Sequence, residues 1–366
     1  MGIHHFKPDV LVFVSTEKME SNKIVEHILQ TLSHLDMDYK DRYQKIIVQE
    51  DSLLDCKKKF DSRIGDKENT KFTVNLTGGT KIMAIAAYEY FKDHASIMGY
   101  IPIGKNEFIT IFPEKANNAI DHITLRLSVE DYLTAYGLKV INTNKLRENH
   151  EDAVSRKELS KWIIKNYDAV KPLLERVSDK IRKHRDEKKG FYWKTSYQPQ
   201  LAEEEELFLK VGFVKYEDGY GKQLSRSEII YLTGGWLEEF CYNELWQFKD
   251  KGIDGIVIGI IAEKQNNKNE FDIMFTKDNA LYTVECKSLD QGSDPKADAL
   301  YKIAALQREF GLRVKSFFVS TSPHILKNGK IKQSIKDRAE LFNTKVIIPN
   351  EVINFGIIVA KELKIE

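Results

Sequence analysis

The chain contains 366 residues, of which 42% are hydrophobic and 30% charged, and its formal net charge at pH 7 is +1. This length and hydrophobic content predict two or three domains with real cores, and no apolar run approaches the roughly 20 residues that cross a membrane. The near-neutral charge excludes a basic field over the whole chain, so any nucleic-acid site must be a local patch.

Strand and helix signals alternate over residues 1–144, which we take as the first domain. We expect strands at 10–14, 45–48, 72–76, 100–102 and 108–112, and helices at 21–35, 53–64 and 82–91. This alternation predicts an α/β fold with a doubly wound parallel sheet. Ligands of such sheets bind at the carboxyl ends of the strands, next to helix N-termini. We expect no signal peptide at the N-terminus, because the apolar residues 11–14 are typical of a short buried strand.

A glycine-rich turn follows the third of these strands and leads into the third helix, with the sequence Thr77-Gly78-Gly79-Thr80-Lys81. Two glycines let the backbone turn sharply and approach a ligand, and the free N–H groups of a helix start attract anionic oxygens. The hydroxyls of Thr77 and Thr80 and the charge of Lys81 suit the same ligand. The spacing is neither that of a Walker A loop nor that of a dinucleotide fingerprint. A tight strand-to-helix turn with Thr80 as the N-cap is the structural alternative.

Residues 145–225 differ in character and are predicted to form a connecting segment. Residues 155–189 are helical and charge-rich, residues 191–193 are aromatic and irregular, and residues 203–206 begin another helix. A small helical or winged module fits this pattern. The basic run at 182–189 could contact a phosphate backbone, although a solvated helix end explains the same residues.

The third segment, residues 226–366, begins with an amphipathic helix predicted from Tyr231 to about Trp246. The early turns of this helix carry Glu238 and Glu239. A carboxylate here could serve a catalytic site. The helix dipole also favours acids in a first turn, which is the alternative explanation for both residues.

A β-hairpin is predicted at 270–287, because apolar and polar residues alternate on both sides of a central turn. Closing this turn symmetrically, with either two or four loop residues, places Asp272 directly opposite Glu285, with Cβ atoms roughly 4.5–5.5 Å apart. Lys287 lies on the same face, one pleat further along. The other face points into a core and carries Phe271, Ile273, Phe275, Tyr282, Val284 and Cys286.

Two carboxylates and a lysine on one face of an otherwise apolar hairpin are costly to desolvate unless a cation or a substrate uses them. The set suits Mg²⁺ or Mn²⁺, which prefer oxygen ligands. Such a metal would polarise a phosphodiester and lower the pKa of a bound water, and Lys287 could orient that water or offset charge on a phosphorane. The alternative is a solvated sheet face whose ion pairs, such as Glu270 with Lys287, have no chemical role.

These hairpin residues resemble the PD-(D/E)xK signature of restriction-endonuclease-like nucleases. Asp272 is followed, after twelve residues, by Glu285-Cys286-Lys287, and Phe271 stands where the motif name has proline. The resemblance implies that Asp272, Glu285 and the backbone carbonyl of Cys286 bind the metal. It also implies that Lys287 supports attack on the phosphorus.

Neighbouring elements extend this resemblance. The family places a helix with a functional glutamate before the hairpin, and Glu238 is the best match for it. After the hairpin the family has a helix and a strand, which we expect at 298–310, with Lys302 and Gln307, and at 314–319.

The first domain resembles the CRISPR-associated Rossmann-fold (CARF) sensor domain, in which a Thr-Gly-Gly-Thr-Lys turn contacts a cyclic oligoadenylate. The match lies at residues 77–81, and the resemblance implies that Ser15 and Thr16, at the end of the first strand, also contact the ligand. The loop at 102–105 could be a third contact. Residues 127–137 look like the end of this domain in the CARF–nuclease effectors of type III CRISPR systems.

A CARF domain followed by this nuclease motif makes the chain similar to those effectors at both of its ends. The resemblance implies a homodimer whose paired CARF domains bind cyclic tetra-adenylate. It further implies an allosterically activated endonuclease that depends on Mn²⁺ or Mg²⁺ and acts in CRISPR antiviral defence. RNA, single-stranded DNA and duplex DNA all remain open as the substrate.

Two other functions stay open beside this one. The first is a constitutive restriction or repair endonuclease with a nucleotide-binding appendage, and the second is a CARF regulator whose nuclease half is vestigial. Slow cleavage of the activator by the CARF domain is also left open. The three cysteines, Cys56, Cys241 and Cys286, lie far apart without metal-ligand spacing, which favours a reducing cytoplasm.

Overall fold

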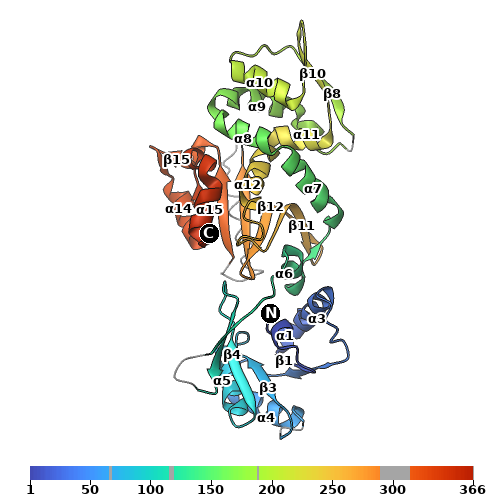
Figure 1. The fold of residues 1–366 in the computed structure, drawn as a ribbon, viewed down its shortest axis with the longest axis vertical. Helices are drawn as coiled ribbons and strands as arrows, with labels where there is room; N and C mark the ends of the chain where they lie inside the picture. The colour runs from blue at the N-terminus through green and yellow to red at the C-terminus, as the bar shows by residue number, and fades with distance from the viewer. Residues whose placement is uncertain (66–67, 115–118, 188, 289–313, 366) are drawn as a thin grey trace. The chain divides into compact units, whose positions relative to one another are not determined.

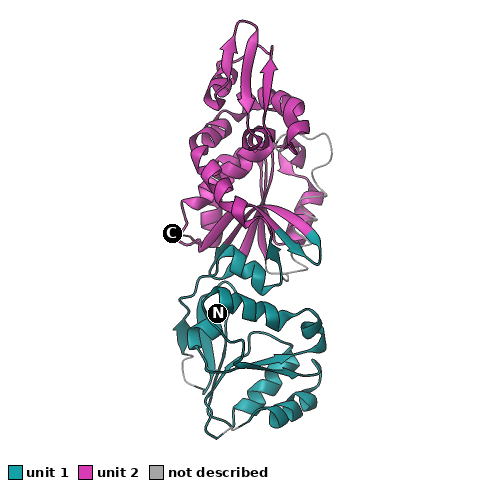
Figure 2. Ribbon diagram, turned by 90° about the vertical axis from the view of Figure 1, so that its right-hand side faces the viewer, with its two compact units in different colours: residues 1–140, 262–267, 276–280 teal, residues 141–261, 268–275, 281–366 magenta. Residues whose placement is uncertain are grey.

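The computed structural model describes residues 1–65, 68–114, 119–187, 189–288 and 314–365. It divides the chain into two compact units, which Figure 2 shows in different colours. Unit 1 contains residues 1–140, 262–267 and 276–280, and unit 2 contains residues 141–261, 268–275 and 281–366. Within the described ranges, no helix has the length and apolar character needed to cross a membrane.

Unit 1 is an α/β fold built on two parallel strand pairs (Figure 1). The first pair is β1 (Leu11–Ser15) with β2 (Tyr43–Ile47), and the second is β3 (Phe72–Asn75) with β4 (Ser96–Tyr100). Two antiparallel strands, β5 (Glu107–Phe112) and β6 (Ile120–His122), extend the second pair. The helices are α1 (Gly2–Phe6), α2 (Glu17–Ser21), α3 (Ile24–His34), α4 (Leu53–Arg63), α5 (Lys81–Phe91) and α6 (Val129–Ala135).

The predicted doubly wound parallel sheet is wrong in one respect, because β1 and β2 form one sheet while β3 to β6 form a second sheet that is partly antiparallel. Most of the individual elements predicted for this unit are present, and two of them differ in their bounds. The predicted helix at 21–35 is present as α3 but begins only at Ile24, because Lys23 adopts left-handed backbone angles and separates it from the short preceding helix α2. The strand predicted at 100–102 lies earlier, at Ser96–Tyr100. Pro102 has no N–H group to donate to a strand ladder, so the pairing ends before it.

The core of unit 1 forms where α4 and α5 pack together against strand residues. Phe60, Met83, Phe91 and Met98 are all at least 93% buried in one hydrophobic cluster. Side-chain caps define where these helices begin: Ser52 accepts a hydrogen bond from the N–H of Asp55, and Thr80 accepts one from the N–H of Met83. The helix α5 therefore begins directly after the Thr-Gly-Gly turn.

The first part of unit 2 is a helical module with a small sheet. It contains α7 (Thr143–Ser155), α8 (Lys157–Lys165), α9 (Tyr167–Ile181), β8 (Phe191–Thr195), α10 (Ala202–Val211), β9 (Val214–Tyr216) and β10 (Gly219–Leu224). The strand order is β8-β10-β9, and both pairings are antiparallel.

The prediction that residues 191–193 are irregular is wrong, because they lie in β8. Phe191 and Trp193 turn toward the hydrophobic core, whereas Tyr192 and Lys194 are exposed. This is the period-two pattern of a half-buried strand. Three consecutive aromatic residues hide that pattern in the sequence.

The second part of unit 2 is a sheet with the strand order β17-β14-β13-β12-β11. Its strands are β11 (Gly255–Lys264), β12 (Asn267–Lys277), β13 (Ala280–Lys287), β14 (Lys315–Ser320) and β17 (Thr344–Ile347), and the last three run parallel to one another. Its helices are α11 (Arg226–Ile230), α12 (Trp236–Trp246), α14 (Gln333–Leu341) and α15 (Phe355–Leu363). The predicted strand at 314–319 is present as β14, whereas the helix predicted at 298–310 lies outside the described residues.

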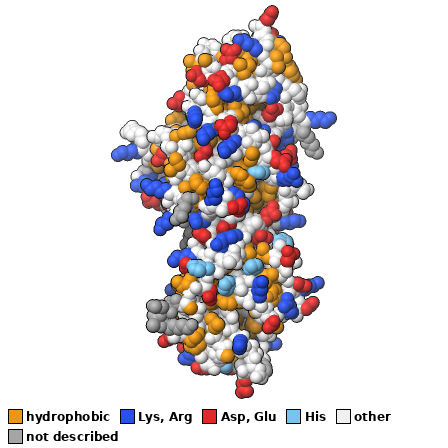
Figure 3. Space-filling model, in the orientation of Figure 1, with side chains coloured by type: hydrophobic (Ala, Val, Ile, Leu, Met, Phe, Trp, Pro, Cys, Tyr) orange, Lys and Arg blue, Asp and Glu red, His pale blue; other side chains and the backbone are white. Residues whose placement is uncertain are grey.

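One hydrophobic cluster joins both parts of unit 2. It includes Leu174 of α9, Phe208 of α10, Phe240 of α12, Phe275 of β12 and Phe317 of β14. The segment before residue 226 therefore shares its core with the sheet that carries the predicted nuclease residues. On the face seen in Figure 3, basic and acidic side chains alternate over the surface, as the net charge near zero led us to expect.

Candidate functional site

The strands β12 and β13 form the predicted hairpin. They are joined by two residues, Asp278 and Asn279, whose φ angles are 50° and 55°. Positive φ at both central residues is typical of a type I′ turn, which matches the twist of the strands it joins. A two-residue turn pairs Lys277 with Ala280, and the same register brings Asp272 opposite Glu285.

The polar face of this hairpin is partly withdrawn from solvent, with Asp272 and Lys287 half-buried and Glu285 buried. Glu285 is 4% exposed, and its Oε1 atom lies 2.9 Å from Nζ of Lys287. The Oδ2 atom of Asp272 accepts a hydrogen bond of 2.7 Å from the N–H of Cys286. The face therefore differs from the solvated sheet surface that was the alternative explanation.

Glu238, on α12, belongs to the same site. Burial, opposed by Arg185 and reinforced by Glu285 and Glu270, raises the pKa of Glu238 to about 7. Burial also raises the pKa of Asp272 well above its usual range, and the charges of Glu238 and Glu285 add to this effect. Three carboxylates from one helix and two strands are therefore electrostatically coupled.

Lys287 is the cation beside these carboxylates. Burial alone would lower the pKa of Lys287, but Glu285 and Asp272 outweigh it, so the pKa is raised and the amine stays protonated at neutral pH. Lys287 and the charge of Arg185 cannot together balance three carboxylates if all of them ionise. The excess negative charge in a desolvated site is the environment that a hard divalent cation stabilises.

The oxygen atoms present fit such a cation. Asp272, Glu285 and the carbonyl of Cys286 could each supply one ligand, and the charge of Glu238 acts on the same site. Among the described residues, no three His, Cys, Asp or Glu side chains form a ready-made metal cage. A metal held here would complete its coordination with water and substrate oxygens, as Mg²⁺ commonly does.

Glu239 has a different role from its neighbour. Its carboxylate accepts hydrogen bonds of 2.9 Å and 3.2 Å from Nε of Arg156, and the Arg156 guanidinium lies over the ring of Tyr231. Consecutive helix residues point about 100° apart, so Glu238 and Glu239 face different surroundings. Glu239 fastens α12 to the start of α8, and Glu238 faces the hairpin.

The Thr-Gly-Gly sequence before α12 forms a wide helical turn, η2 (Tyr231–Gly235), which the sequence had not predicted. Gly234 has φ = 135°, and a Cβ atom added there would lie 2.5 Å from Oγ of Ser288. Only glycine allows this close approach of the helix to the end of β13. The two adjacent glycines inside a helical pattern were the signal that could have revealed it.

Arg185, in the basic run 182–189, affects the carboxylate site. Its positive charge is the main effect opposing the raised pKa of Glu238, so the guanidinium acts on the carboxylate site through space. Arg185 follows the short helix η1 (Arg182–His184), which ends the long helical stretch of α9. The described part of the basic run thus includes a cation placed to attract a phosphate.

The predicted sensor turn lies in unit 1. Thr80 donates a hydrogen bond of 2.6 Å to the carbonyl of Glu50, and Thr77 Oγ1 accepts one of 2.7 Å from the N–H of Ile101. Gly79 has φ = 79°, and a Cβ atom added to Gly78 would meet no atom within 4 Å. Lys81 is exposed at the first turn of α5. The turn is therefore firmly held and open to solvent.

Ser15 and Thr16 are buried at the carboxyl end of β1. Ser15 is 4% exposed and Thr16 is 7% exposed. The Thr16 hydroxyl accepts a hydrogen bond of 3.3 Å from the N–H of Met19 and so caps α2. These two residues shape the edge of the sheet next to which ligands of this fold bind.

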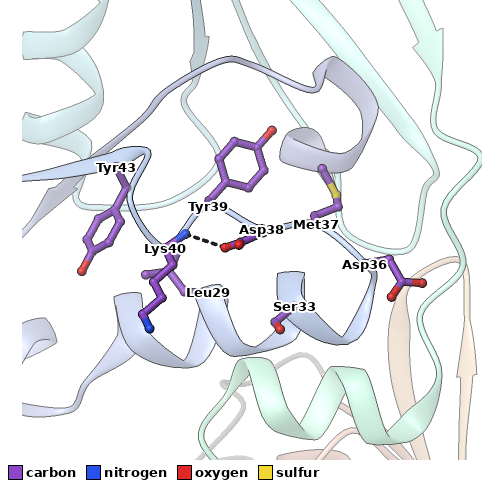
Figure 4. A pocket seen from close by; sticks show the side chains of 8 residues that line it. All are labelled: Leu29, Ser33, Asp36, Met37, Asp38, Tyr39, Lys40 and Tyr43. Atoms are coloured by element: carbon purple, nitrogen blue, oxygen red, sulfur yellow. Dashed lines mark hydrogen bonds between the residues drawn. The ribbon is translucent and has the colours of Figure 1, made fainter.

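A separate hollow of about 530 Å³ lies between α3 and β2 in unit 1 (Figure 4). It is lined by Leu29, Ser33, Asp36, Met37, Asp38, Tyr39, Lys40 and Tyr43. Within it the N–H of Lys40 donates to Oδ1 of Asp38. None of the predicted site residues contributes to this lining.

Comparisons with known proteins agree with this arrangement. Residues 3–132 match the family described as the Card1 CARF domain, and residues 226–355 match the family described as the Card1-like endonuclease domain. A comparison with curated protein sequences gives no significant match.

Two solved structures share the fold over nearly the whole chain. Protein VC1899 from Vibrio cholerae is 19% identical with a TM-score of 0.77, covering 99% of this chain and 93% of its own. Can2 from Sulfobacillus thermosulfidooxidans, solved in complex with cyclic tetra-adenylate, is 20% identical with a TM-score of 0.73, covering 97% of this chain and 94% of its own.

Proposed function

We propose that this chain, which belongs to the CARF-domain nucleases that join a Card1 CARF domain to a Card1-like endonuclease domain, is a metal-dependent endonuclease activated by a cyclic oligoadenylate. The observation that carries the proposal is the electrostatically coupled set of carboxylates, the half-buried Glu238 and Asp272 and the buried Glu285, beside Lys287. A role in CRISPR antiviral defence follows from the pairing of the two domain types.

Each residue of the nuclease site has a proposed role. Asp272, Glu285 and the carbonyl of Cys286 hold Mn²⁺ or Mg²⁺, which supplies Lewis acidity and an activated water when bound. Lys287 is protonated and offsets the negative charge that develops on the attacked phosphate. Glu238, with its pKa near neutrality, assists metal binding or orients the water.

The sensor site is proposed at the turn Thr77–Lys81 together with Ser15 and Thr16. The exposed Lys81 and the N–H groups at the start of α5 suit the phosphates of the ligand, and the glycines let those phosphates approach the backbone. A ring with internal symmetry fits two copies of this turn, so we propose a homodimer with a two-fold pocket. Cyclic tetra-adenylate, which occupies Can2, is the first ligand to test.

The substrate is proposed to be nucleic acid, either DNA or RNA. Arg185, whose charge acts on Glu238, is the group that we propose to hold its backbone. The three cysteines are free and buried thiols, which is consistent with the proposed reducing cytoplasm.

The proposal is tested with purified protein, Mn²⁺ and labelled RNA, single-stranded DNA and duplex DNA, each with and without cyclic tetra-adenylate. We expect cleavage of at least one substrate, only when metal and activator are both present. Equal cleavage without the activator would identify a constitutive endonuclease. Tight activator binding without cleavage of any substrate would identify a CARF regulator.

A further inference from the structure

We propose that Asn279 is a positioning residue that fastens the turn of the catalytic hairpin to the sensor unit. The inference deepens the proposed function and rests on it. Through this turn, the ligand state of the sensor would reach Asp272 on β12 and Glu285 on β13. The residues 276–280, which include the turn, group with unit 1, although both strands continue into unit 2.

The amide of Asn279 makes three hydrogen bonds in unit 1. Its Nδ2 atom donates to Oδ1 of Asn106 at 2.5 Å and to the carbonyl of Leu125 at 3.0 Å. Its Oδ1 atom accepts from the N–H of Leu127 at 2.9 Å. The residue is only 7% exposed, so each lost partner would leave a buried polar group unsatisfied.

Two further bonds hold the same turn. Nδ2 of Asn106 donates to Oδ1 of Asp278 at 2.9 Å, so the Asn106 amide donates to one central residue of the turn and accepts from the other, Asn279. On the strand side, Thr276 donates to the carbonyl of Leu127 at 2.7 Å and is itself fully buried. A solvated β-turn requires none of these bonds, because water satisfies its polar groups.

Asn106 adjoins one of the proposed ligand loops. It stands directly after residues 102–105, which could form the third contact to the activator. At one end, this loop is held where the N–H of Ile101 donates to Thr77 of the sensor turn at 2.7 Å. At the other, the carbonyl of Asn106 accepts from the N–H of Ile123 at 2.8 Å. A ligand that moves this loop therefore acts on the partner of Asn279.

The hairpin is suited to pass such a movement on. Its type I′ turn fixes both central residues in the left-handed region, and its two strands are paired from the turn to the site. Interdigitated, close-packed elements move as units because their interiors have little free volume. A shift of the turn would therefore alter the spacing of Asp272 and Glu285 relative to Glu238.

The test is the Asn279→Gly variant, because Asp-Gly is also a favoured type I′ sequence and the turn keeps its geometry. The matched control is Asn266→Gly. Asn266 occupies the same second position in the two-residue turn between β11 and β12, where φ is 49° for Gln265 and 67° for Asn266, and it is exposed. Asn106→Ala removes the same contact from the sensor side and serves if Asn279→Gly does not fold.

Three quantities are measured for each protein: the Kd for cyclic tetra-adenylate, the thermal unfolding temperature, and the ratio of cleavage rates with and without saturating activator. We expect Asn279→Gly and Asn106→Ala to bind the activator within about threefold of wild type and to lose the activation ratio by about tenfold or more. Asn266→Gly should keep the wild-type ratio.

The outcomes separate the inference from the proposed function. A folded Asn279→Gly variant with the wild-type activation ratio overturns the inference alone. A loss of activation that is fully explained by weaker activator binding also overturns it. Wild-type protein that cleaves equally with and without the activator overturns the proposed function, and this inference with it.

Discussion

Glu238 and Asp272 lie on different elements, and the negative charge of Glu238 helps to raise the pKa of Asp272. One residue belongs to α12 and the other to β12, so their proximity exists only in the folded unit. Buried acids that perturb one another in this way mark candidate functional sites. Every prediction about the nuclease site starts from this relationship.

Removing one carboxylate should abolish cleavage without affecting the sensor. We expect Asp272→Asn or Glu285→Gln to lower the activated cleavage rate by about a hundredfold or more, because each removes charge from the metal site. Activator binding, measured separately, should stay at the wild-type level. Glu151→Gln is the control, since Glu151 lies on α7 with its side chain 61% exposed and should tolerate the change. Full activity in Asp272→Asn would show that the site is elsewhere.

Glu238 should make the metal-free protein less stable as the pH rises. Its pKa is about 7 when folded and 4.5 ordinarily, so the folded state holds the extra proton between these values. The bound proton contributes on the order of 3 kcal/mol to the free energy of unfolding. This contribution is fully present below about pH 4.5 and is lost as the pH rises through 7. The unfolding free energy of wild type relative to Glu238→Gln, measured by urea titration across pH 5–8, should show this slope. A difference that is constant with pH would contradict the raised pKa.

Glu239 should matter for stability and not for chemistry. Glu239→Ala leaves the guanidinium of Arg156 buried beside an unfilled space, and we expect a loss of about 3 kcal/mol or more in the free energy of unfolding. The cleavage rate per folded molecule should be unchanged. Glu151→Ala provides the control, because its pair with Arg147 is 61% and 87% exposed and should contribute almost nothing. A selective loss of activity in Glu239→Ala would place this residue in the site after all.

Gly234→Ala should disturb the site through the backbone. The added Cβ would meet Oγ of Ser288 at 2.5 Å, on a backbone that already needs φ = 135°. Gly329→Ala, at φ = 73° with no atom within 4 Å of the new Cβ, tests the backbone cost alone. We expect Gly234→Ala to lower the unfolding temperature more than Gly329→Ala and to reduce activated cleavage. Equal effects of the two variants would show that the approach to Ser288 is unimportant.

Arg185 should act on substrate binding. We expect Arg185→Ala to raise KM for the nucleic acid by about tenfold while kcat changes less, because the guanidinium attracts the backbone and is not a metal ligand. The effect should shrink as the salt concentration rises. Lys165→Ala, which removes an exposed charge from α8, is the control. An unchanged KM would indicate that Arg185 is only a solvated residue at the end of a helix.

The features predicted from sequence are those that depend on local patterns. The hairpin follows from period-two alternation and from Asp278-Asn279, two residues that tolerate positive φ, and the N-cap role of Thr80 follows from its place before α5. The alternation of strands and helices in unit 1 is also local, and it was sufficient to predict an α/β fold.

Features that depend on distant partners could not be predicted in the same way. Glu238 and Glu239 are neighbours with the same chemistry, and only the packing of Arg156 against one of them separates their roles. The strand β11 was missed because no pairing partner is visible in the sequence. The grouping of residues 276–280 with unit 1 depends on Asn106, Leu125 and Leu127, which lie far away in the chain.

The central claim is that the carboxylate site is complete but idle until the sensor turn is occupied. It is tested most directly by the single-turnover cleavage rate in Mn²⁺, with and without cyclic tetra-adenylate, for wild type and for Lys81→Ala. We predict that the activator accelerates wild type strongly, that Lys81→Ala keeps only the slow basal rate, and that chelation of the metal stops both. A wild-type rate that is the same with and without the activator would contradict the account.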